Sequence, residues 1–255
     1  MTKKAAPARV QTWIVYKLAK KTERLGTVEA ANDEEARERA FEELNIRPQD
    51  RSKIVASEPG QSVVYDISDS AFTDAIEIRQ LIHLLETQNS GGVNARLNAA
   101  DAGTAALILR NALVSRLVLL VSRVYDQSTY PTDRNVGRAM ALLDDPEVRM
   151  EIGQRGPSGS LARTDALWNR LKSDVRRERI KHFRDRYTAH IGQPNPAIPL
   201  PQFNELFAYA RETTHLMWSL AEATGARTES IDGWDPQLTE SAAAFWQPWQ
   251  SEDGN

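Results

Sequence analysis

The sequence predicts an α+β protein in which a small ββαβ module precedes a bundle of helices. Near the N-terminus, two runs rich in β-branched and aromatic residues are separated by a short polar stretch. From about Ala71 onward, apolar residues recur at helical spacing almost to the C-terminus. Between these regions, residues 58–62 combine proline, glycine and serine, which is typical of a domain boundary. We therefore expect residues 1–60 to form the module and residues 70–250 the bundle.

The predicted module consists of two strands, a helix and a third strand. Residues 10–18 and 24–31 have the composition of strands. Asn32 can cap the helix that follows, because Glu35 stands at the capping-box spacing three residues later. Residues 52–57 complete the unit as a strand. About fifty residues are marginal for folding alone, so we expect the module to pack on the bundle or to dock a partner protein.

The predicted bundle begins, after a short extended stretch at 62–67, with a helix over 73–88 that two glycines end. A second helix, over 98–127, is apolar nearly all round, so we expect it at the centre of the bundle. The remaining expected elements are a short helix at 133–143, a polar glycine-rich loop at 146–159, long helices over 160–190 and 203–224, and a short aromatic segment at 242–249.

The composition excludes several classes of protein. The chain has no cysteine, which excludes disulfides, thiolate zinc sites and thiol catalysis, and it fits a reducing cytoplasm. The net charge is -3, so any surface that binds nucleic acid must be a local patch. Residues 1–9 lead into no apolar core, so we expect no signal peptide. Arg110 and Arg116 interrupt the apolar run at 105–121, which we expect to be too short and too charged to span a membrane.

The helix expected over 160–190 carries a strong local charge. Between Arg170 and Arg186, eight basic residues face three acidic ones, which gives about +5 in a chain whose total is -3. An RNA backbone needs such an excess, although solvated helix faces show the same pattern. The residues that we expect to contact RNA are Arg177, Lys181 and Arg186 of this helix and Arg116 and Arg123 of the apolar helix.

The basic helix ends in Arg184, Asp185 and, six positions after the arginine, His190. Arginine binds phosphate through a charged planar fork, and histidine exchanges a proton near neutral pH, so the two together can cut RNA without a metal. In the alternative interpretation without a function, Arg184 is a solvated cation and His190 caps the C-terminus of the helix. On an ideal helix, residues four positions apart lie on the same face, so Arg186 and His190 would share a face. Arg184 is six positions from His190 and would not lie on that face. Either the helix ends or bends before His190, or Arg186 is the working cation.

Two arginines of the apolar helix, Arg116 and Arg123, are seven positions apart and lie on one face. Arg123 is also three positions from Asp126, so those two side chains can pair. One interpretation is that the arginine stems pack on the core while the charged ends reach water. The other is that one of the two arginines faces the site of Arg184 and His190.

With these residues in view, the region 70–225 resembles a HEPN domain, in particular that of AbiU2-like abortive-infection proteins. The resemblance rests on segments 110–114 and 122–126 of the apolar helix and on segment 183–190. HEPN proteins are helical bundles whose motif is an arginine, a polar neighbour and a histidine after four to six further residues. The resemblance implies a metal-independent, cofactor-free endoribonuclease of a phage-defence system (abortive infection or toxin–antitoxin), usually a homodimer with both motifs facing one cleft.

The resemblance also implies roles for single residues. His190 would act as general base or acid on a ribose 2'-hydroxyl, whose attack on the adjacent phosphate leaves a 2',3'-cyclic phosphate. Arg184 would stabilise the developing charge, and Asp185 would orient a neighbouring group. HEPN toxins that are silenced by adenylylation carry a tyrosine two positions before the histidine. Position 188 is threonine in this chain, so we do not expect that control.

Two other functions stay open at this point. Many HEPN domains bind nucleotides or scaffold assemblies without cutting RNA, so the chain can also be a non-catalytic module whose ββαβ part docks a protein. A metal hydrolase is the weaker alternative, and we expect no metal site. The four histidines show no paired ligand spacing; they are His83, His182, His190 and His215.

Overall fold

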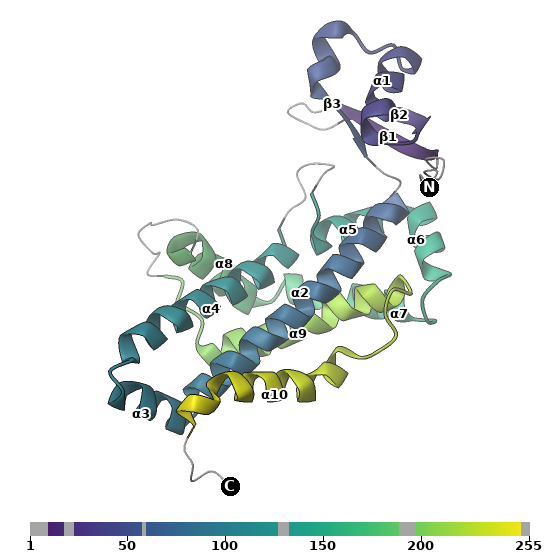
Figure 1. Ribbon diagram of the computed structural model, residues 1–255. Coiled ribbons are helices and arrows are strands. Elements are labelled where there is room, and N and C mark those ends of the chain that lie inside the picture. Colours follow the sequence, from purple (N-terminus) through teal and green to yellow (C-terminus); the bar gives the residue numbers. More distant parts are fainter. Residues whose placement is uncertain (1–9, 18–22, 58–59, 127–132, 189–196, 251–255) are drawn as a thin grey trace, which may run out of the picture.

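The computed structural model describes residues 10–17, 23–57, 60–126, 133–188 and 197–250. These residues form a small antiparallel sheet with one helix, followed by a bundle of helices (Figure 1), which confirms the predicted α+β class. In Figure 1 the sheet lies beyond one end of the longest helix, and that helix runs through the length of the bundle. The division into two domains at about residue 60 stays a prediction.

The sheet has the strand order β2-β1-β3, with β1 (Gln11–Lys17) at its centre. Both neighbours, β2 (Glu23–Ala30) and β3 (Ile54–Ser57), pair with β1 in the antiparallel sense. A 3₁₀ turn (η1, Pro48–Lys53) precedes β3. Helix α1 (Asp33–Glu43) covers one face of the sheet and shares a core with it. That core includes the buried side chains of Trp13, Val15, Val28, Ala36, Ala40, Ile46 and Ile54.

The predicted cap of the first helix is confirmed. Asn32 is the N-cap of α1, and its Oδ1 accepts a hydrogen bond of 2.9 Å from the backbone N–H of Glu35. The Glu35 carboxylate in turn accepts one of 2.9 Å from the backbone N–H of Ala31. The start of this helix is therefore fixed by local side-chain chemistry, which a sequence shows directly.

Helix α2 (Gly60–Asn89) is longer than the sequence analysis predicted. The extended stretch expected at 62–67 is wrong, because Val63 and Ile67 extend the apolar stripe of this helix toward its N-terminus and are buried. Gly60, expected in a boundary loop, is the first residue of the helix. Helix α2 packs along α9 (Phe203–Ala223), and these two helices form the middle of the main core (Figure 1).

The apolar helix expected over 98–127 consists of two helices, α3 (Gly91–Ala99) and α4 (Gly103–Val124). Helix α4 lies at the side of the bundle rather than at its centre (Figure 1), so the prediction that it is buried all round is wrong. Leu107, Ile108 and Leu119 are 45%, 66% and 40% exposed. The opposite face packs on α2 and contributes Val114, Leu117, Val118, Leu120, Val121 and Val124 to the core.

Helix α4 is also the one helix among the described residues that is long and apolar enough to cross a membrane by length and composition. The prediction that this run is too short and too charged is therefore wrong, because the helix has 22 residues. Only 28% of its most apolar window is buried. The buried part nevertheless joins the core of the bundle, as core helices of soluble proteins do.

Three further helices occupy the region from 133 to 172. Helix α5 (Val136–Leu142) is capped by Asn135. The loop expected at 146–159 contains helix α6 (Pro146–Gly153), because Asp145 caps it and two of its side chains, Val148 and Ile152, are buried. The glycines of this stretch predicted a loop, but an N-cap residue followed by proline, here Asp145 and Pro146, favours the start of a helix. Helix α7 (Ser160–Lys172) follows, with Gly159 as its N-cap.

The single helix expected over 160–190 is broken after α7. Asp174 caps a separate helix, α8 (Val175–Phe183), by accepting a hydrogen bond of 2.8 Å from the backbone N–H of Arg176. At the C-terminal end, helix α10 (Asp235–Trp246) is longer than the aromatic segment expected at 242–249, and it follows a 3₁₀ turn, η3 (Ile231–Trp234). Trp246 is 2% exposed, so this aromatic residue packs on the bundle.

A buried arginine joins the C-terminal region to α2. The Arg79 side chain is 3% exposed, and it forms ion pairs of 2.8 Å with both Asp232 and Asp235. Its Nε donates a hydrogen bond of 2.8 Å to Thr214, and its Nη2 lies 3.1 Å from the Nε2 of His215. Burial lowers the pKa of His215, and the attraction of Asp232 only partly opposes this. The network thus contains one buried cation whose partners all come from the C-terminal part of the chain.

We predict that Arg79→Met lowers the free energy of unfolding by about 2 kcal/mol or more, because it removes the hydrogen bonds that a buried guanidinium makes to Thr214, Asp232 and Asp235. The matched control is Arg227→Met, since Arg227 also pairs with an acid of α2, Asp69 at 2.8 Å, but on the surface. This control should cost at most about 1 kcal/mol. Urea unfolding of both variants measures the difference. Equal losses would contradict the structural role of Arg79.

A second prediction concerns pH. Because the pKa of His215 is lowered in the folded protein, the unfolded chain binds a proton at higher pH than the folded chain. Stability from this group is therefore present above the ordinary histidine pKa of about 6.5 and is lost as the pH falls below it. Urea unfolding between about pH 7 and pH 5 should show a smaller loss for His215→Gln than for the wild type. An unchanged pH dependence would refute this assignment.

Candidate functional site

The helix geometry changes at the arginine of the motif. The α-helix α8 ends at Phe183, and the chain continues as a π-helix, η2 (Arg184–Thr188). Such turns use i→i+5 hydrogen bonds and occur frequently at functional sites. The ideal-helix geometry that separated Arg184 from His190 therefore ends at Phe183. His190 lies outside the described residues, so its distance from Arg184 stays a prediction.

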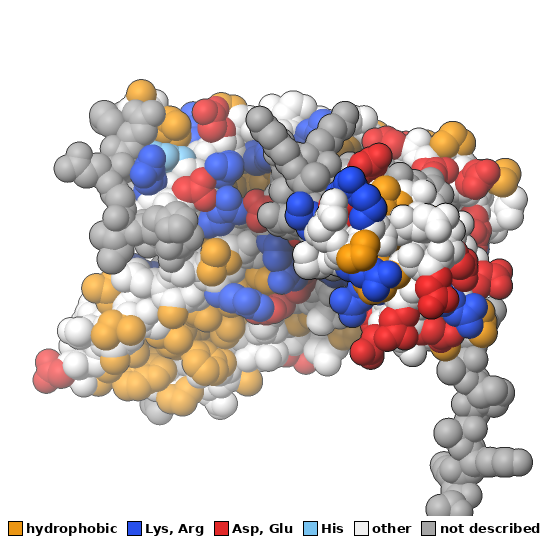
Figure 2. Space-filling view, turned by 90° about the horizontal axis from the view of Figure 1, so that it is seen from above, with side chains coloured by type: hydrophobic (Ala, Val, Ile, Leu, Met, Phe, Trp, Pro, Cys, Tyr) orange, Lys and Arg blue, Asp and Glu red, His pale blue; other side chains and the backbone are white. Residues whose placement is uncertain are grey.

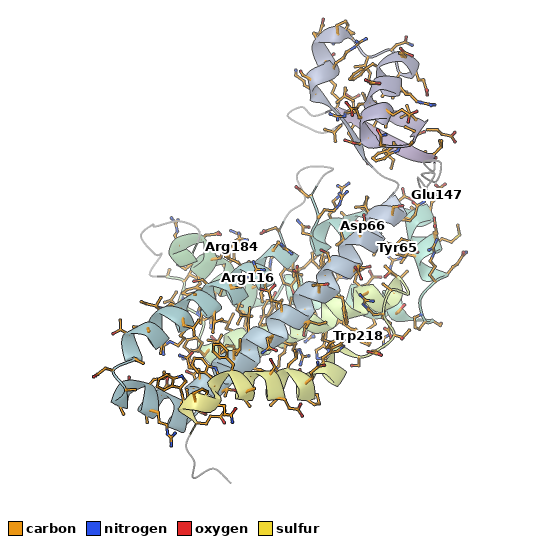
Figure 3. All side chains as sticks on the ribbon, in the orientation of Figure 1. Tyr65, Asp66, Arg116, Glu147, Arg184 and Trp218 are labelled. Atoms are coloured by element: carbon orange, nitrogen blue, oxygen red, sulfur yellow. The ribbon has the colours of Figure 1, made fainter. Side chains whose placement is uncertain are left out.

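Two carboxylates hold Arg184. Its Nη1 donates a hydrogen bond of 2.7 Å to Asp126, at the C-terminal end of α4, and its Nε donates one of 2.8 Å to Asp185. Only 17% of the Arg184 side chain is exposed. Burial works against the charge, but the hydrogen bonds with Asp126 and Asp185 outweigh it and raise the pKa of Arg184. The guanidinium is therefore charged and fixed in orientation. Figure 3 labels Arg184 on the side of the bundle where α8 lies.

Asp185 connects two cations. One of its carboxylate oxygens accepts from Arg184 and the other lies 2.6 Å from the Nζ of Lys181, one helical turn earlier. Burial raises the pKa of Asp185, but the hydrogen bonds from Lys181 and Arg184 outweigh this and lower it. Asp185 is therefore ionised at neutral pH. The three side chains form a short chain of alternating charges along one side of the helix.

The end of α4 is fixed against α8 by aromatic and backbone contacts. The guanidinium of Arg177 lies 5.5 Å from the ring centroid of Tyr125 and donates a hydrogen bond of 3.3 Å to the Tyr125 carbonyl. The Tyr125 hydroxyl is 3.0 Å from that of Thr213, and burial raises the pKa of Tyr125 to about 12. The crevice between Asp126 and Arg184 has a volume of about 10 Å³. It is too small for a nucleotide.

A larger hollow lies on another side of the same helix. Its volume is about 550 Å³, and it is lined by Glu178, Lys181, His182, Asp185, Arg186 and Ile198. Arg186 is exposed and has no hydrogen-bond or ion-pair partner among the described residues. This arginine and Lys181 can therefore meet an anion that enters the hollow.

His182 lines this hollow and was not predicted as a site residue. It is 9% exposed, and its buried Nε2 has no hydrogen-bond partner in the described part of the chain. A buried polar atom without a partner is uncommon and needs an explanation. In the sequence His182 is simply one of four histidines, and no spacing of residues indicates that it faces a cavity. Its burial depends on the packing of α8, which no local signal predicts.

The basic excess of this region is smaller than the sequence indicated. Arg170 and Arg176 pair with Glu212 at 2.6 and 2.9 Å, and Arg179 pairs with Glu205 at 2.9 Å. Both glutamates belong to α9, which is distant in sequence but packs beside α7 and α8. Figure 2 accordingly shows Lys and Arg side chains interleaved with Asp and Glu. The acids of α9 thus offset part of the local charge of about +5, as the solvated, ion-paired interpretation of this region predicts.

The two arginines of α4 also have partners elsewhere. Arg116 forms an ion pair of 2.7 Å with Glu77, and Arg123 pairs with Asp74; both acids belong to α2. The predicted pairing of Arg123 with Asp126 is wrong, because Asp126 pairs with Arg184. Asp126, which follows α4, thus contacts Arg184, and neither Arg116 nor Arg123 of α4 does so. Arg116 and Arg123 remain about half exposed.

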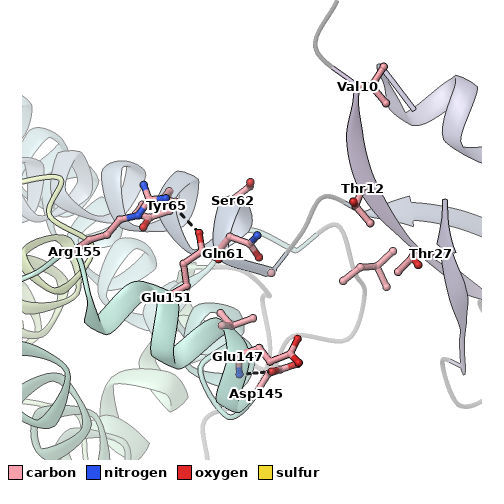
Figure 4. Close-up of a pocket in the computed structure, with 13 residues that line it drawn as sticks. Val10, Thr12, Thr27, Gln61, Ser62, Tyr65, Asp145, Glu147, Glu151 and Arg155 are labelled. Carbon is pink, nitrogen blue, oxygen red and sulfur yellow. Dashed lines mark hydrogen bonds and ion pairs between the residues drawn. The ribbon is translucent and has the colours of Figure 1, made fainter. Parts of the chain in front are cut away.

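Another hollow lies between the sheet and the bundle (Figure 4). It has a volume of about 720 Å³. The bundle side supplies three acids, Asp145, Glu147 and Glu151, against one arginine, Arg155. The sheet side supplies Val10, Thr12, Ile14 and Thr27. An acidic lining repels phosphates, so this hollow does not suit RNA.

His83 and His215, which are distant from each other in sequence, both lie near the acids that pair with Arg79. His83 lies 3.3 Å from Asp235, and His215 lies 3.6 Å from Asp232. Both carboxylates are already paired with the Arg79 guanidinium. No group of three or more His, Asp or Glu side chains within the described ranges is arranged to hold a metal ion. The candidate site therefore remains the region around Arg184.

Comparison with known families supports the assignment of the bundle. The model of the family HEPN_AbiU2, described as AbiU2, matches residues 64–244. The chain belongs to the AbiU2 HEPN family. This confirms the resemblance proposed from the sequence. The match includes Asp126, Arg184 and position 190 of the HEPN bundle, whereas the sheet lies outside it. No curated protein and no solved structure matches the chain.

We predict that Asp126→Asn loosens the π-helical segment of this HEPN bundle, because it removes the negative charge that holds Arg184. Amide hydrogen exchange over Arg184–Thr188 should become faster, while exchange in α2 is unchanged. The matched control is Glu77→Gln, which removes the carboxylate that pairs with Arg116 on the surface. This control should leave the segment unaffected. Unchanged exchange in Asp126→Asn would show that the ion pair does not fix the segment.

Proposed function

We propose that this AbiU2 HEPN protein is a metal-independent endoribonuclease of a phage-defence system, of the abortive-infection or toxin–antitoxin type, which acts in the cytoplasm. The main support for the proposal is the fixed and charged side chain of Arg184. This side chain is charged and held in one orientation by Asp126 and Asp185, and it is the arginine of the HEPN-like motif identified in the sequence. A charge that is oriented before the reaction stabilises a transition state more than a mobile one.

The proposed reaction needs one imidazole and one cation. His190 takes the proton of a ribose 2'-hydroxyl, and the 2'-oxygen forms a bond with the adjacent phosphorus. The bond from phosphorus to the 5'-oxygen breaks, and the leaving oxygen takes up a proton. The products are a 2',3'-cyclic phosphate and a 5'-hydroxyl. Arg184 stabilises the negative charge that develops on the phosphate oxygens, and the step needs no metal or cofactor.

The surroundings of Arg184 decide from which side RNA approaches. Arg184 lines the crevice toward α4, which is too small for a nucleotide, whereas the 550 Å³ hollow is lined by Arg186 and not by Arg184. RNA that enters this hollow therefore meets Arg186 first, and Asp185, which lines the hollow and binds Arg184, connects the two arginines. Lys181 and Arg186 line that hollow and hold the phosphate backbone. Arg177 is engaged with Tyr125, and Arg116 and Arg123 are paired with acids, so these three expected contacts add less.

We predict distinct kinetic effects for three substitutions, measured with purified full-length protein, RNA and EDTA. His190→Ala should lower kcat by about 100-fold or more, because proton transfer contributes at least that factor. Arg184→Gln should also lower kcat, by about 100-fold, because it removes charge stabilisation. Arg186→Gln should mainly raise KM, because this residue binds the phosphate before and during the reaction alike.

The control for these variants is Arg170→Gln, which removes a cation of the same basic region that pairs with Glu212 away from the hollow. Its cleavage rate should equal that of the wild type. Circular dichroism should show that all four variants remain folded. If Arg186→Gln lowers kcat while Arg184→Gln only raises KM, the two arginines have the opposite roles. If His190→Ala still cleaves at the wild-type rate, the proposed reaction is refuted.

One observation favours a second function, that of a non-catalytic HEPN module that binds RNA or a nucleotide. The charge of Arg184 is matched by carboxylates of its own chain, as in a structural ion pair. Under this alternative, RNA incubated with the protein stays intact, and binding weakens steeply as salt is raised. In either case, we propose that the sheet module, which has its own core, docks a partner protein.

A further inference from the structure

The hollow of about 550 Å³ beside α8 has the size of a ligand site, since such sites measure about 300–1,000 Å³. Two cations, Lys181 and Arg186, line it and are exposed. His182 lines it as well and is only 9% exposed, which makes it the most buried of the described lining residues. The hollow therefore fits a ligand with two unlike ends, one charged and beside the cations, the other less polar and beside the imidazole.

The imidazole of His182 lacks a hydrogen-bond partner at one nitrogen. Its Nε2 is buried, and no described residue donates to it or accepts from it. An unpaired buried polar atom destabilises a folded protein, because it has lost its hydrogen bonds with water. A ligand in the hollow can supply the missing partner, since His182 is part of the lining.

A nucleobase has the two properties that this interior requires. Its faces are apolar and can pack on Ile198, which is partly buried and adds an aliphatic surface to the lining. Its edge carries N–H groups and acceptor atoms that can pair with His182. Proteins that read single-stranded RNA bind unstacked bases by these two kinds of contact. The phosphate of the same nucleotide then stays in water with the exposed cations.

A free carboxylate of the same hollow indicates which base fits. Glu178 lies one helical turn before His182, and its side chain has no hydrogen-bond or ion-pair partner among the described residues, whereas Asp185 already binds two cations. A carboxylate only accepts hydrogen bonds. Guanine is the base that presents two neighbouring donors, N1–H and the N2 amino group, on one edge. Glu178 and Arg186 are about 12 Å apart along the helix at 1.5 Å per residue, which leaves room for a base edge at one end and a phosphate at the other.

We propose that this hollow binds one unstacked guanine nucleotide of the RNA. Arg186 and Lys181 hold its phosphate, and Glu178 and His182 hydrogen-bond the edge of its base. The assignment rests on the proposed function because it takes RNA as the ligand, but it does not require cleavage. It adds sequence specificity to a site whose cations bind any phosphate. The RNA is single-stranded at this nucleotide, because a paired guanine uses the same edge.

Calorimetric titration of the full-length protein with nucleoside 5'-monophosphates and with ribose 5-phosphate tests the proposal. GMP should bind at least about fivefold more tightly than ribose 5-phosphate, which has the same phosphate and sugar but no base. GMP should also bind at least about fivefold more tightly than UMP, which offers the carboxylate a single donor. Equal binding of GMP and ribose 5-phosphate would overturn the base site. Binding of AMP, CMP or UMP as tight as that of GMP would overturn the choice of guanine.

Substitutions at His182 separate a ligand contact from a structural role. His182→Leu nearly keeps the volume of the side chain but removes both nitrogens, so it should be at least as stable in urea as the wild type. It should weaken GMP binding about fivefold and leave ribose 5-phosphate binding unchanged. His182→Gln, which keeps a polar group near the position of Nε2, should retain most of the affinity for GMP. A less stable His182→Leu, or one that binds GMP as the wild type does, would overturn the proposal.

The carboxylate has a matched control of its own. Glu178→Gln should remove the preference for GMP over UMP, whereas Glu147→Gln, at an exposed acid of α6 that lines a different hollow, should leave it unchanged. A preference that survives in Glu178→Gln would overturn the role of this acid. Mononucleotides contain no internucleotide bond, so these titrations do not depend on cleavage. RNA cleavage without a preference for GMP would refute this proposal alone, and GMP binding without RNA cleavage would refute the proposed reaction alone.

Discussion

The ion pair between Asp126 and Arg184 is the contact on which the geometry of the site depends. It joins the C-terminal end of α4 to the point where α8 changes from an α-helix to a π-helix. Asp185, the next residue of the motif, holds the same guanidinium from its other side. A side chain that is 83% buried and charged must have such partners, because an unpaired buried charge is costly. The partners therefore explain both the position of the arginine and its charge.

The same rule governs the rest of the basic region. Glu205 and Glu212 of α9 pair with Arg170, Arg176 and Arg179, and the described cations of this region that line a hollow large enough for an anion are Lys181 and Arg186. A protein of net charge -3 can bind RNA only through a local patch of this kind. The hollow near the sheet, by contrast, is lined by three acids and one arginine, and such a lining repels phosphates.

Local signals made much of the fold predictable. The cap at Asn32 and the three strands depend on neighbouring residues, and each was found where the sequence indicated it. The exposed side of α4 was missed because periodicity shows that a helix is apolar, not which neighbours cover it. The motif residues were likewise visible, but Asp126 pairs with an arginine 58 positions away, and only the packing of α4 on α8 brings them together.

The most direct test of this account is a double-mutant cycle on single-turnover RNA cleavage with Asp126→Asn, Arg184→Gln and the combined variant. If Asp126 acts by orienting Arg184, its removal slows cleavage in the wild type but has no further effect once Arg184 is replaced. The double variant should then cleave at the rate of Arg184→Gln alone. Independent effects, in which the two losses multiply, would contradict the view that this ion pair prepares the arginine for the reaction.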